Sequence, residues 1–245
     1  MRLAIISDVH ANLPALDAIL ADIETQRPDR LYCLGDLVGY GASPNEVIDR
    51  IRRADIPTVM GNYDDGVGFD RDDCGCAYKD PIDRELGQRS LMWTRVQTTA
   101  DNKAFLRSLV PQIRVDSSGT RVLLVHGSPR KMNEYLFEDR PRSSFERLAR
   151  SSNADVIVFG HTHVPYTKLV ERVLFVNAGS VGKPKDGDSR ACYAVIEVAA
   201  ESAVMFRRVA YDISAAARAI RQSDLPHKFA TDLEVGGARA AAATQ

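Results

Sequence analysis

Polar residues that can bind metals recur where apolar runs of this sequence end. They comprise two aspartates, one asparagine and four of the chain's five histidines, namely Asp8, His10, Asp36, Asn62, His126, His161 and His163. Imidazole and carboxylate groups together suit Mn²⁺, Fe²⁺ or Zn²⁺, whereas oxygen ligands alone would suit Mg²⁺ or Ca²⁺. Seven ligands exceed the needs of one tetrahedral ion, but they fit two ions that share a carboxylate. Such a pair of metals is an arrangement that hydrolyses phosphate esters.

Each of these residues also has a structural explanation. A single histidine at the end of a strand is usually structural, and Asp36 could form a turn within the glycine-rich stretch GDLVGYG, residues 35–41. Four histidines at such positions, two of them in His161-Thr162-His163, are poorly explained as independent structural residues. The sequence therefore favours a metal site.

A parallel sheet would bring these residues together. Residues 2–6, 31–35 and 56–62 are apolar runs typical of strands, and residues 12–24 and 43–54 have helical periodicity. The first sixty residues thus predict a β-α-β-α-β pattern with crossover helices. Because loops at the carboxyl ends of parallel strands meet at one crevice, the polar residues there should converge.

The pattern changes after residue 64. Residues 63–82 are polar and glycine-rich, and two helices are expected over 81–96 and 101–110. Further strands are expected at 121–125, 155–160, 166–170, 172–177, 191–198 and 202–210, followed by a helix at 213–222. We expect a single domain over residues 1–232, with a helical insertion at about 65–110, and a disordered tail over 233–245.

Composition limits the partners of this 245-residue chain. Its 32 basic and 33 acidic residues nearly balance, so general binding of nucleic acid is not expected. No apolar run approaches the ~18 residues of a membrane span, and the apolar N-terminal run is too short for a signal peptide. We therefore expect a cytoplasmic protein without membrane contact.

The four cysteines offer a weaker signal. Cys33 and Cys192 lie in apolar runs and are expected in the core. Cys74 and Cys76 form a CxC pair that could bind a metal or undergo redox chemistry, but no second Cys or His pair lies nearby in sequence to complete a zinc site.

Five motifs, DVH, GDLVGYG, GNYD, HGS and GHTHVP, resemble in type and order those of the calcineurin-like metallophosphoesterase superfamily. The stretch VNAGSVGKP resembles the loop after the last metal histidines in its small bacterial and archaeal phosphodiesterase branch. The match covers roughly residues 1–64 and 120–197. It implies an α/β fold, an αββα sandwich of two mixed β-sheets flanked by helices, with a dinuclear metal site at its edge.

The same resemblance assigns ligands and catalytic residues. Asp8, His10, Asp36 and His163 would hold one ion, and Asp36, Asn62, His126 and His161 the other. Asp36 would then bridge two divalent transition-metal ions, with Mn²⁺ expected first and Fe, Zn or Ni as alternatives. Asp36, Asn62, Tyr63 and His126 would form the catalytic set.

Tyr63 departs from many family members, which carry at this position a histidine that protonates the leaving oxygen. A tyrosine with a pKa of about 10 donates a proton less readily at neutral pH. Aryl and nucleotide leaving groups need less acid assistance, so phosphodiesters are favoured as substrates. Alternatively, Tyr63 only packs against its loop.

Two residues are weaker candidates for substrate contacts. Asn12 could touch substrate or cap a helix, and Arg130 could meet a phosphate or remain a solvated loop charge. The predicted function is hydrolysis of a small phosphate ester or nucleotide at two metal ions, with phosphodiesters favoured. The alternatives are a phosphomonoesterase or phosphoprotein phosphatase on the same site, or a non-catalytic scaffold of the same fold.

Overall fold

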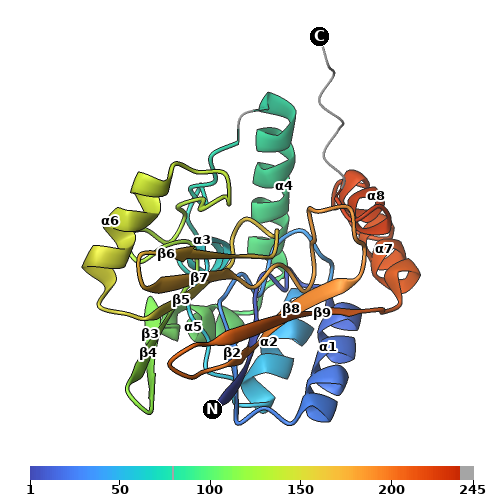
Figure 1. Ribbon diagram of the computed structural model, residues 1–245. Helices are drawn as coiled ribbons and strands as arrows, with labels where there is room; N and C mark the ends of the chain where they lie inside the picture. The colour runs from blue at the N-terminus through green and yellow to red at the C-terminus, as the bar shows by residue number, and fades with distance from the viewer. Residues whose placement is uncertain (79, 238–245) are drawn as a thin grey trace.

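Two β-sheets lie face to face at the centre of the molecule, and helices cover their outer faces (Figure 1). The computed structural model describes residues 1–78 and 80–237. Leu3 and Ile5 of one sheet share a buried cluster with Val122, Leu124 and Val158 of the other. The predicted αββα sandwich of two mixed sheets is therefore confirmed.

The first sheet has four strands in the order β2-β1-β8-β9. Their bounds are Arg2–Ile6 for β1, Arg30–Cys33 for β2, Ala191–Glu197 for β8 and Ala203–Val209 for β9. β1 pairs in parallel with β2, with Ile6 opposite Cys33, and antiparallel with β8. The carboxyl ends of β1 and β2 consequently lie at the same edge of the sheet.

The second sheet has five strands in the order β3-β4-β5-β7-β6. Their bounds are Gln112–Ser117 for β3, Thr120–Val125 for β4, Val156–Phe159 for β5, Tyr166–Val170 for β6 and Val173–Asn177 for β7. β4, β5 and β7 are parallel neighbours. The carboxyl ends of β4 and β5 therefore also meet at one edge.

Burial on both faces explains why the central strands read as continuous apolar runs. In β1, Leu3 and Ile5 face the second sheet, while Ala4 and Ile6 pack in the cluster that contains the outer helices. Those helices are α1 (Leu13–Gln26), α2 (Pro44–Arg53), α7 (Ile213–Arg221) and α8 (Lys228–Glu234). Helix α6 (Arg142–Ser152) covers the second sheet through Phe145 and Leu148.

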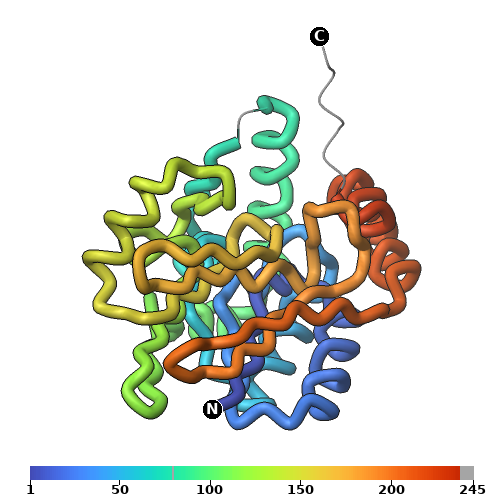
Figure 2. The backbone as a smooth tube through the Cα atoms, in the orientation of Figure 1, coloured from blue at the N-terminus to red at the C-terminus, as the bar shows by residue number. Residues whose placement is uncertain are grey.

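Three helices follow residue 61. They are α3 (Asn62–Gly68), α4 (Pro81–Gln97) and α5 (Ala100–Ser108). The helices expected over 81–96 and 101–110 are thus confirmed, and α3 adds one that the sequence did not indicate. Figure 2 shows α7, near the C-terminus, beside α1, near the N-terminus. The two helices are in contact although most of the sequence separates them.

Other expectations need correction. The strand expected at 56–62 is reduced to two isolated bridges, from Thr58 to Cys33 and from Val59 to Val110. Strand β3 and helices α6 and α8 were not predicted.

The C-terminal region is described only in part. Helix α8 includes Leu233 and Glu234, and the Gly187 N–H donates to the Gly236 carbonyl at 3.0 Å. The first residues of the expected 233–245 tail are therefore ordered, and residues 238–245 lie outside the described residues. Among the helices described, none combines the length and the apolar character needed to cross a membrane.

Candidate metal centre

Loops at the carboxyl ends of four strands carry six of the seven predicted ligands. The six are Asp8 and His10 after β1, Asp36 after β2, His126 after β4, and His161 and His163 after β5. The seventh, Asn62, is instead the first residue of helix α3. All seven residues are at most 3% exposed. The structure thus brings together the set that the sequence singled out.

Five of these residues have a left-handed backbone. The φ angles are 54° at Asp8, 48° at His10, 53° at Asp36, 65° at His161 and 62° at His163. This conformation costs roughly 1–3 kcal/mol for a residue other than glycine and persists only where the surroundings impose it. Here the N–H of Asp8 donates to the Gly35 carbonyl at 3.0 Å, and that of His10 to the Asp36 carbonyl at 2.9 Å. The turns after β1 and β2 therefore hold one another.

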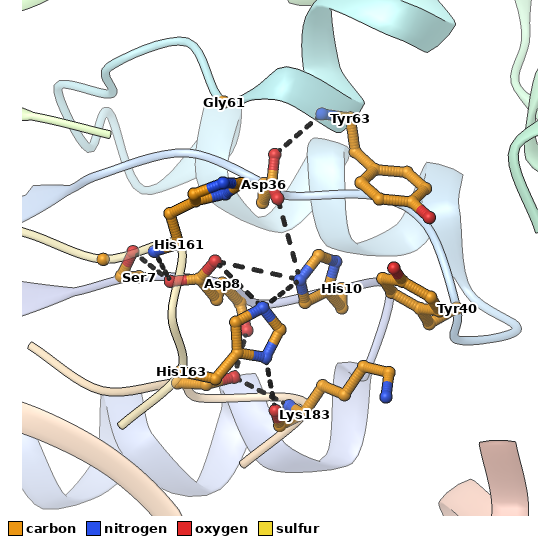
Figure 3. Close-up of polar contacts among 12 residues, drawn as sticks. Ser7, Asp8, His10, Asp36, Tyr40, Gly61, Tyr63, His161, His163 and Lys183 are labelled. Atoms are coloured by element: carbon orange, nitrogen blue, oxygen red, sulfur yellow. Dashed lines mark hydrogen bonds and ion pairs between the residues drawn. The ribbon is translucent and has the colours of Figure 1, made fainter. Parts of the chain in front are cut away.

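The side chains form two groups. Within each group, the ligand atoms lie within 4.8 Å of one another. The first group is Asp8, His10 and His163, and the second is Asp36, His126 and His161. In the first, His163 Nε2 lies 3.4 Å from Asp8 Oδ1 and 3.2 Å from His10 Nε2 (Figure 3). These separations suit neighbouring ligands of one ion with bonds of about 2.0–2.2 Å.

Asp36 lies between the two groups. Its Oδ2 is 3.4 Å from His126 Nε2 in the second group and 3.7 Å from His10 Nε2 in the first. Asn62 Oδ1 lies 3.1 Å from His126 Nε2, so the asparagine adjoins the second group. Asp36 thus adjoins both groups, while the assignment of the seven residues to two metal ions stays a prediction.

Backbone carbonyls orient three of the imidazoles. Nδ1 of His10 donates to the Val38 carbonyl at 2.9 Å, and Nδ1 of His126 to that of Leu34 at 2.8 Å. Nδ1 of His163 donates to the carbonyl of Lys183. Because a carbonyl can only accept, Nδ1 carries the hydrogen in each case. In a neutral ring Nε2 then presents a lone pair to the site, as metal-binding histidines do.

Buried lone pairs therefore face one another without a proton between them. The Nε2 atoms of His10 and His163 are 3.2 Å apart, beside Asp8 Oδ1. Asp8 Oδ1 and His161 Nε2 are buried without any hydrogen-bond partner among the described residues. Leaving such atoms unpaired costs about 1–3 kcal/mol each, and divalent ions would satisfy them. The residues present thus fit metal ions.

Burial keeps most of the imidazoles neutral. It lowers the pKa of His10 to about 4 and holds the pKa values of His161 and His163 well below the ordinary value. For His126, burial also opposes the charge, but the charge of Asp36 and its hydrogen bond outweigh this and raise the pKa to about 10. His126 thus differs from the other three imidazoles because it faces Asp36 directly.

Asp64, the last residue of the GNYD motif, is a positioning residue. Its carboxylate accepts hydrogen bonds from the N–H groups of Asp36 (2.8 Å), Leu37 (2.8 Å) and Gly61 (2.9 Å). It ties the Asp36 turn to the start of α3. The next residue, Asp65, pairs instead with the half-exposed Arg71.

Ser7 and two glycines support the ligands; Ser7 directly precedes the DVH motif, and Gly61 and Gly160 open the GNYD and GHTHVP motifs. Ser7 Oγ donates to Asp8 Oδ2 at 2.6 Å. A Cβ added to Gly160 would lie 2.0 Å from Ser7 Oγ, and one added to Gly61 would lie 2.2 Å from Asp36 Oδ1. Any larger residue would displace these carboxylates.

The Tyr63 phenol belongs to a buried tyrosine cluster. Its Oη lies 3.1 Å from Tyr78 Oη, and its ring packs 4.8 Å from that of Tyr40 and 5.6 Å from that of His10. Burial and the neighbouring phenols raise its pKa well above the ordinary value, which disfavours acid catalysis. The Tyr63 N–H instead donates to Asp36 Oδ1 at 2.8 Å.

The two predicted substrate contacts differ in their surroundings. Asn12 Oδ1 caps α1 at Ala15 N, and its Nδ2 donates to Gly182 O and Tyr211 Oη, so its polar atoms have structural partners. Arg130 pairs with Glu134 at the rim of a cleft of about 1150 Å³.

One wall of that cleft adjoins the second ligand group. Tyr135 also lines it, and the Tyr135 ring packs 4.1 Å from the ring of His161. Arg130 therefore shares a cleft with a neighbour of the metal centre.

The cysteines are all unpaired thiols. Cys33 and Cys192 are buried in the core, as expected. Cys74 and Cys76 lie beside the second group, with Cys76 Sγ accepting from Asn62 Nδ2 at 3.2 Å and the two sulfurs 3.1 Å apart. Their motif therefore borders the metal centre, although neither sulfur belongs to the two ligand groups.

Known proteins share this fold and site region. A family model, the calcineurin-like phosphoesterase superfamily domain, matches residues 1–201. An uncharacterised protein of Methanocaldococcus jannaschii is 33% identical, with 96% of this chain and 98% of the relative covered. The phosphodiesterase YfcE of Escherichia coli is 27% identical, with 77% of this chain and 83% of YfcE covered.

Two solved structures have a similar fold. The crystal structure of a metallophosphoesterase from Sphaerobacter thermophilus is 33% identical, with a TM-score of 0.77, and the match covers 96% of this chain and 99% of the other. A hypothetical protein from Pyrococcus horikoshii shares the fold, with a TM-score of 0.83 at 23% identity over 98% and 99% of the two chains. With the family model matching most of its length, the chain belongs to the calcineurin-like phosphoesterase superfamily.

Proposed function

We propose that this protein hydrolyses phosphate esters with two divalent metal ions. Asp8, His10, Asp36 and His163 hold one ion, and Asp36, Asn62, His126 and His161 hold the other. The observation that carries the proposal is the convergence of buried lone pairs, above all the facing Nε2 atoms of His10 and His163 at 3.2 Å. We propose Mn²⁺ as the native metal, with Fe, Zn or Ni as alternatives for the same donors.

Two bound ions would supply Lewis-acid stabilisation of charge on the phosphoryl oxygens and lower the pKa of water. The protein's own residues fix where this chemistry occurs. Asp36 is held by the Tyr63 N–H on its side chain and by Asp64 on its backbone. Carbonyls hold the rings of His10, His126 and His163, so little reorganisation accompanies the reaction.

Phosphodiesters are the proposed substrate class. Tyr63 stands where many family members have a histidine acid, and its phenol is buried with a raised pKa. A centre without a ready proton donor favours esters whose leaving group departs as a stable anion, such as an aryl or nucleotide group. The relative YfcE is called a phosphodiesterase, which supports the same choice.

The experiment is a comparison of substrates by metal-stripped protein reconstituted with Mn²⁺. Bis(4-nitrophenyl) phosphate should be hydrolysed with a higher kcat/KM than 4-nitrophenyl phosphate, nucleoside monophosphates or a phosphopeptide. A preference for the phosphopeptide would indicate a phosphoprotein phosphatase. Absence of any hydrolysis with both sites loaded would indicate a non-catalytic scaffold of this fold.

A further inference from the structure

The CxC pair at residues 74–76 lies on a fixed turn at the border of the metal centre. Gly75 has a φ of 70°, in the left-handed region that favours glycine. Its N–H donates to Asp73 Oδ1, and its carbonyl accepts from Asn133 Nδ2 at 2.7 Å. A Cβ at this position would lie 2.1 Å from Asn133 Nδ2. The turn thus depends on glycine, and it brings the side chains of Cys74 and Cys76 together.

The two sulfurs are close enough to react with each other. The S–H of Cys74 donates to Cys76 Sγ at 3.1 Å, and a disulfide of about 2.0 Å requires them to approach by only about 1 Å. Cys76 is partly exposed, whereas Cys74 is 8% exposed. A solvent-accessible cysteine next to a second one that can resolve it is the arrangement found in redox-sensor pairs. Cys33 and Cys192 are instead fully buried in the core.

The surroundings of the pair do not form a metal site. A structural zinc ion takes four ligands from cysteine, histidine or carboxylate side chains. Within residues 1–78 and 80–237, no such side chain joins Cys74 and Cys76 in a group of three ligand atoms close enough to hold an ion. The chemistry open to the pair is therefore that of two neighbouring thiols.

Cys76 also contacts a candidate metal ligand. Its Sγ accepts a hydrogen bond from Asn62 Nδ2 at 3.2 Å, while Asn62 Oδ1 lies 3.1 Å from His126 Nε2. The amide is thus held with its nitrogen towards the sulfur and its oxygen towards the second ligand group. A disulfide would move Cys76 Sγ towards Cys74 and replace the thiol sulfur that fixes this amide. The state of the pair is therefore coupled to the orientation of Asn62.

We propose that Cys74 and Cys76 are a modification site, a dithiol that a hydroperoxide converts to a disulfide, and that the disulfide weakens ion binding at the second ligand group through Asn62. The Cys76 sulfur attacks a peroxide oxygen and the O–O bond breaks, which leaves a sulfenic acid and releases an alcohol that carries the thiol proton. The Cys74 sulfur then displaces the sulfenic oxygen, which leaves with the second thiol proton as water. The sulfurs lose two electrons and the peroxide gains them. Only the effect on the ion rests on the proposed function.

The modification is tested on the full-length, Mn²⁺-loaded protein with hydrogen peroxide, followed by catalase. The four thiols counted after denaturation should fall to two, dithiothreitol should restore them, and the disulfide should map to a peptide that contains both Cys74 and Cys76. Cys192→Ser, the matched control, should lose as many thiols as the wild type. Cys74→Ser should form no disulfide, and dimedone should trap its sulfenic acid on Cys76. Retention of all four wild-type thiols, or a disulfide that maps elsewhere, would overturn the inference.

The coupling is tested by titrating reduced and oxidised wild-type protein with Mn²⁺. The oxidised form should bind the second ion about 10–100-fold more weakly, the scale of losing a group that orients a metal ligand. Cys76→Ser keeps an acceptor for Asn62 but cannot form the disulfide, so its affinity should be the same before and after peroxide. Equal affinities of the two wild-type forms would overturn the coupling. A reduced protein that binds fewer than two ions would contradict the proposed function, whereas the thiol count tests the disulfide independently.

Discussion

Asp36 adjoins both ligand groups and is proposed to bridge the two ions. Its Oδ2 lies within 3.7 Å of Nε2 atoms in both groups, and its Oδ1 accepts the Tyr63 N–H. Its carboxylate is therefore the shared negative charge of the centre. Asparagine has nearly the same shape and can still accept from Tyr63, which makes Asp36→Asn a test of charge rather than of shape.

We expect Asp36→Asn to lower kcat for a phosphodiester by more than tenfold and to reduce the number of tightly bound ions. The loss reflects removal of a catalytic group, which typically contributes 10²–10⁴-fold. The matched control is Asp65→Asn, because Asp65 pairs with Arg71 outside the ligand groups. Turnover above about a tenth of wild type at saturating metal, on the scale of such losses, would show that Asp36 is not shared.

Tyr63 tests the choice of substrate class. Tyr63→His should raise monoesterase activity relative to diesterase activity, because an imidazole can protonate a poorer leaving group at neutral pH. The gain is bounded by about 10²–10⁴-fold and should be smaller, since the new ring is not positioned by its neighbours. Measuring kcat/KM for one diester and one monoester with the same leaving group, at equal metal occupancy, gives the ratio. If the wild type prefers the monoester and the ratio does not change, Tyr63 does not set substrate class.

Strands β4 and β5 carry three of the ligands at their carboxyl ends, and an ion pair joins their opposite ends. Arg121 Nη2 lies 2.8 Å from Asp155 Oδ1, and Arg121 N and Nε donate to Asp155 Oδ2 at 2.8 and 3.0 Å. The hydrogen bond from the Arg121 side chain, and to a lesser degree that from the Arg121 backbone N–H, lower the pKa of Asp155 from 3.8 to about 2. An acid whose pKa is lower in the folded than in the unfolded protein stabilises the fold at pH values above its unfolded-state pKa. This stabilisation is lost as the pH falls through the folded-state pKa.

We therefore expect Asp155→Asn to be less stable than wild type at pH 7, with the gap narrowing between about pH 4 and pH 2. Urea unfolding at pH 7 and pH 3 measures the two gaps. Glu201→Gln, on the exposed turn between β8 and β9, should show a smaller gap at pH 7. An undiminished gap at pH 3 would mean that the carboxylate charge does not contribute.

Among the elements, strands that are buried on both faces could be predicted from their apolar runs. Strands with a polar or interrupted sequence could not. β1 and β5 read as strands because their neighbours on both faces are apolar. β3 alternates between partly buried and exposed residues and lies at the edge of its sheet, paired with β4, so its sequence is polar. Residues 56–62 have strand composition, yet Gly61 must approach Asp36 and Asn62 starts α3, which limits pairing to two bridges.

At the scale of the molecule, strand order explains why the candidate ligands converge. β1 and β2 in one sheet and β4 and β5 in the other end at the same side of the sandwich, where their loops meet. The left-handed turns, the Asp64 bonds and the tyrosine cluster depend on contacts between distant segments, which no local pattern encodes. An apolar cavity beside His10 is likewise lined by α1, the loop at 40–43, α7 and α8, which lie far apart in the sequence.

The whole account depends on two ions acting together in one centre. The most direct measurement is a titration of metal-stripped protein with Mn²⁺, with bound metal per chain and phosphodiester hydrolysis followed in parallel. We expect hydrolysis to be absent after chelation, to rise with added metal and to level off at two ions per chain. Saturation at one ion or fewer, or hydrolysis that persists after chelation, would contradict a dinuclear centre built on Asp36.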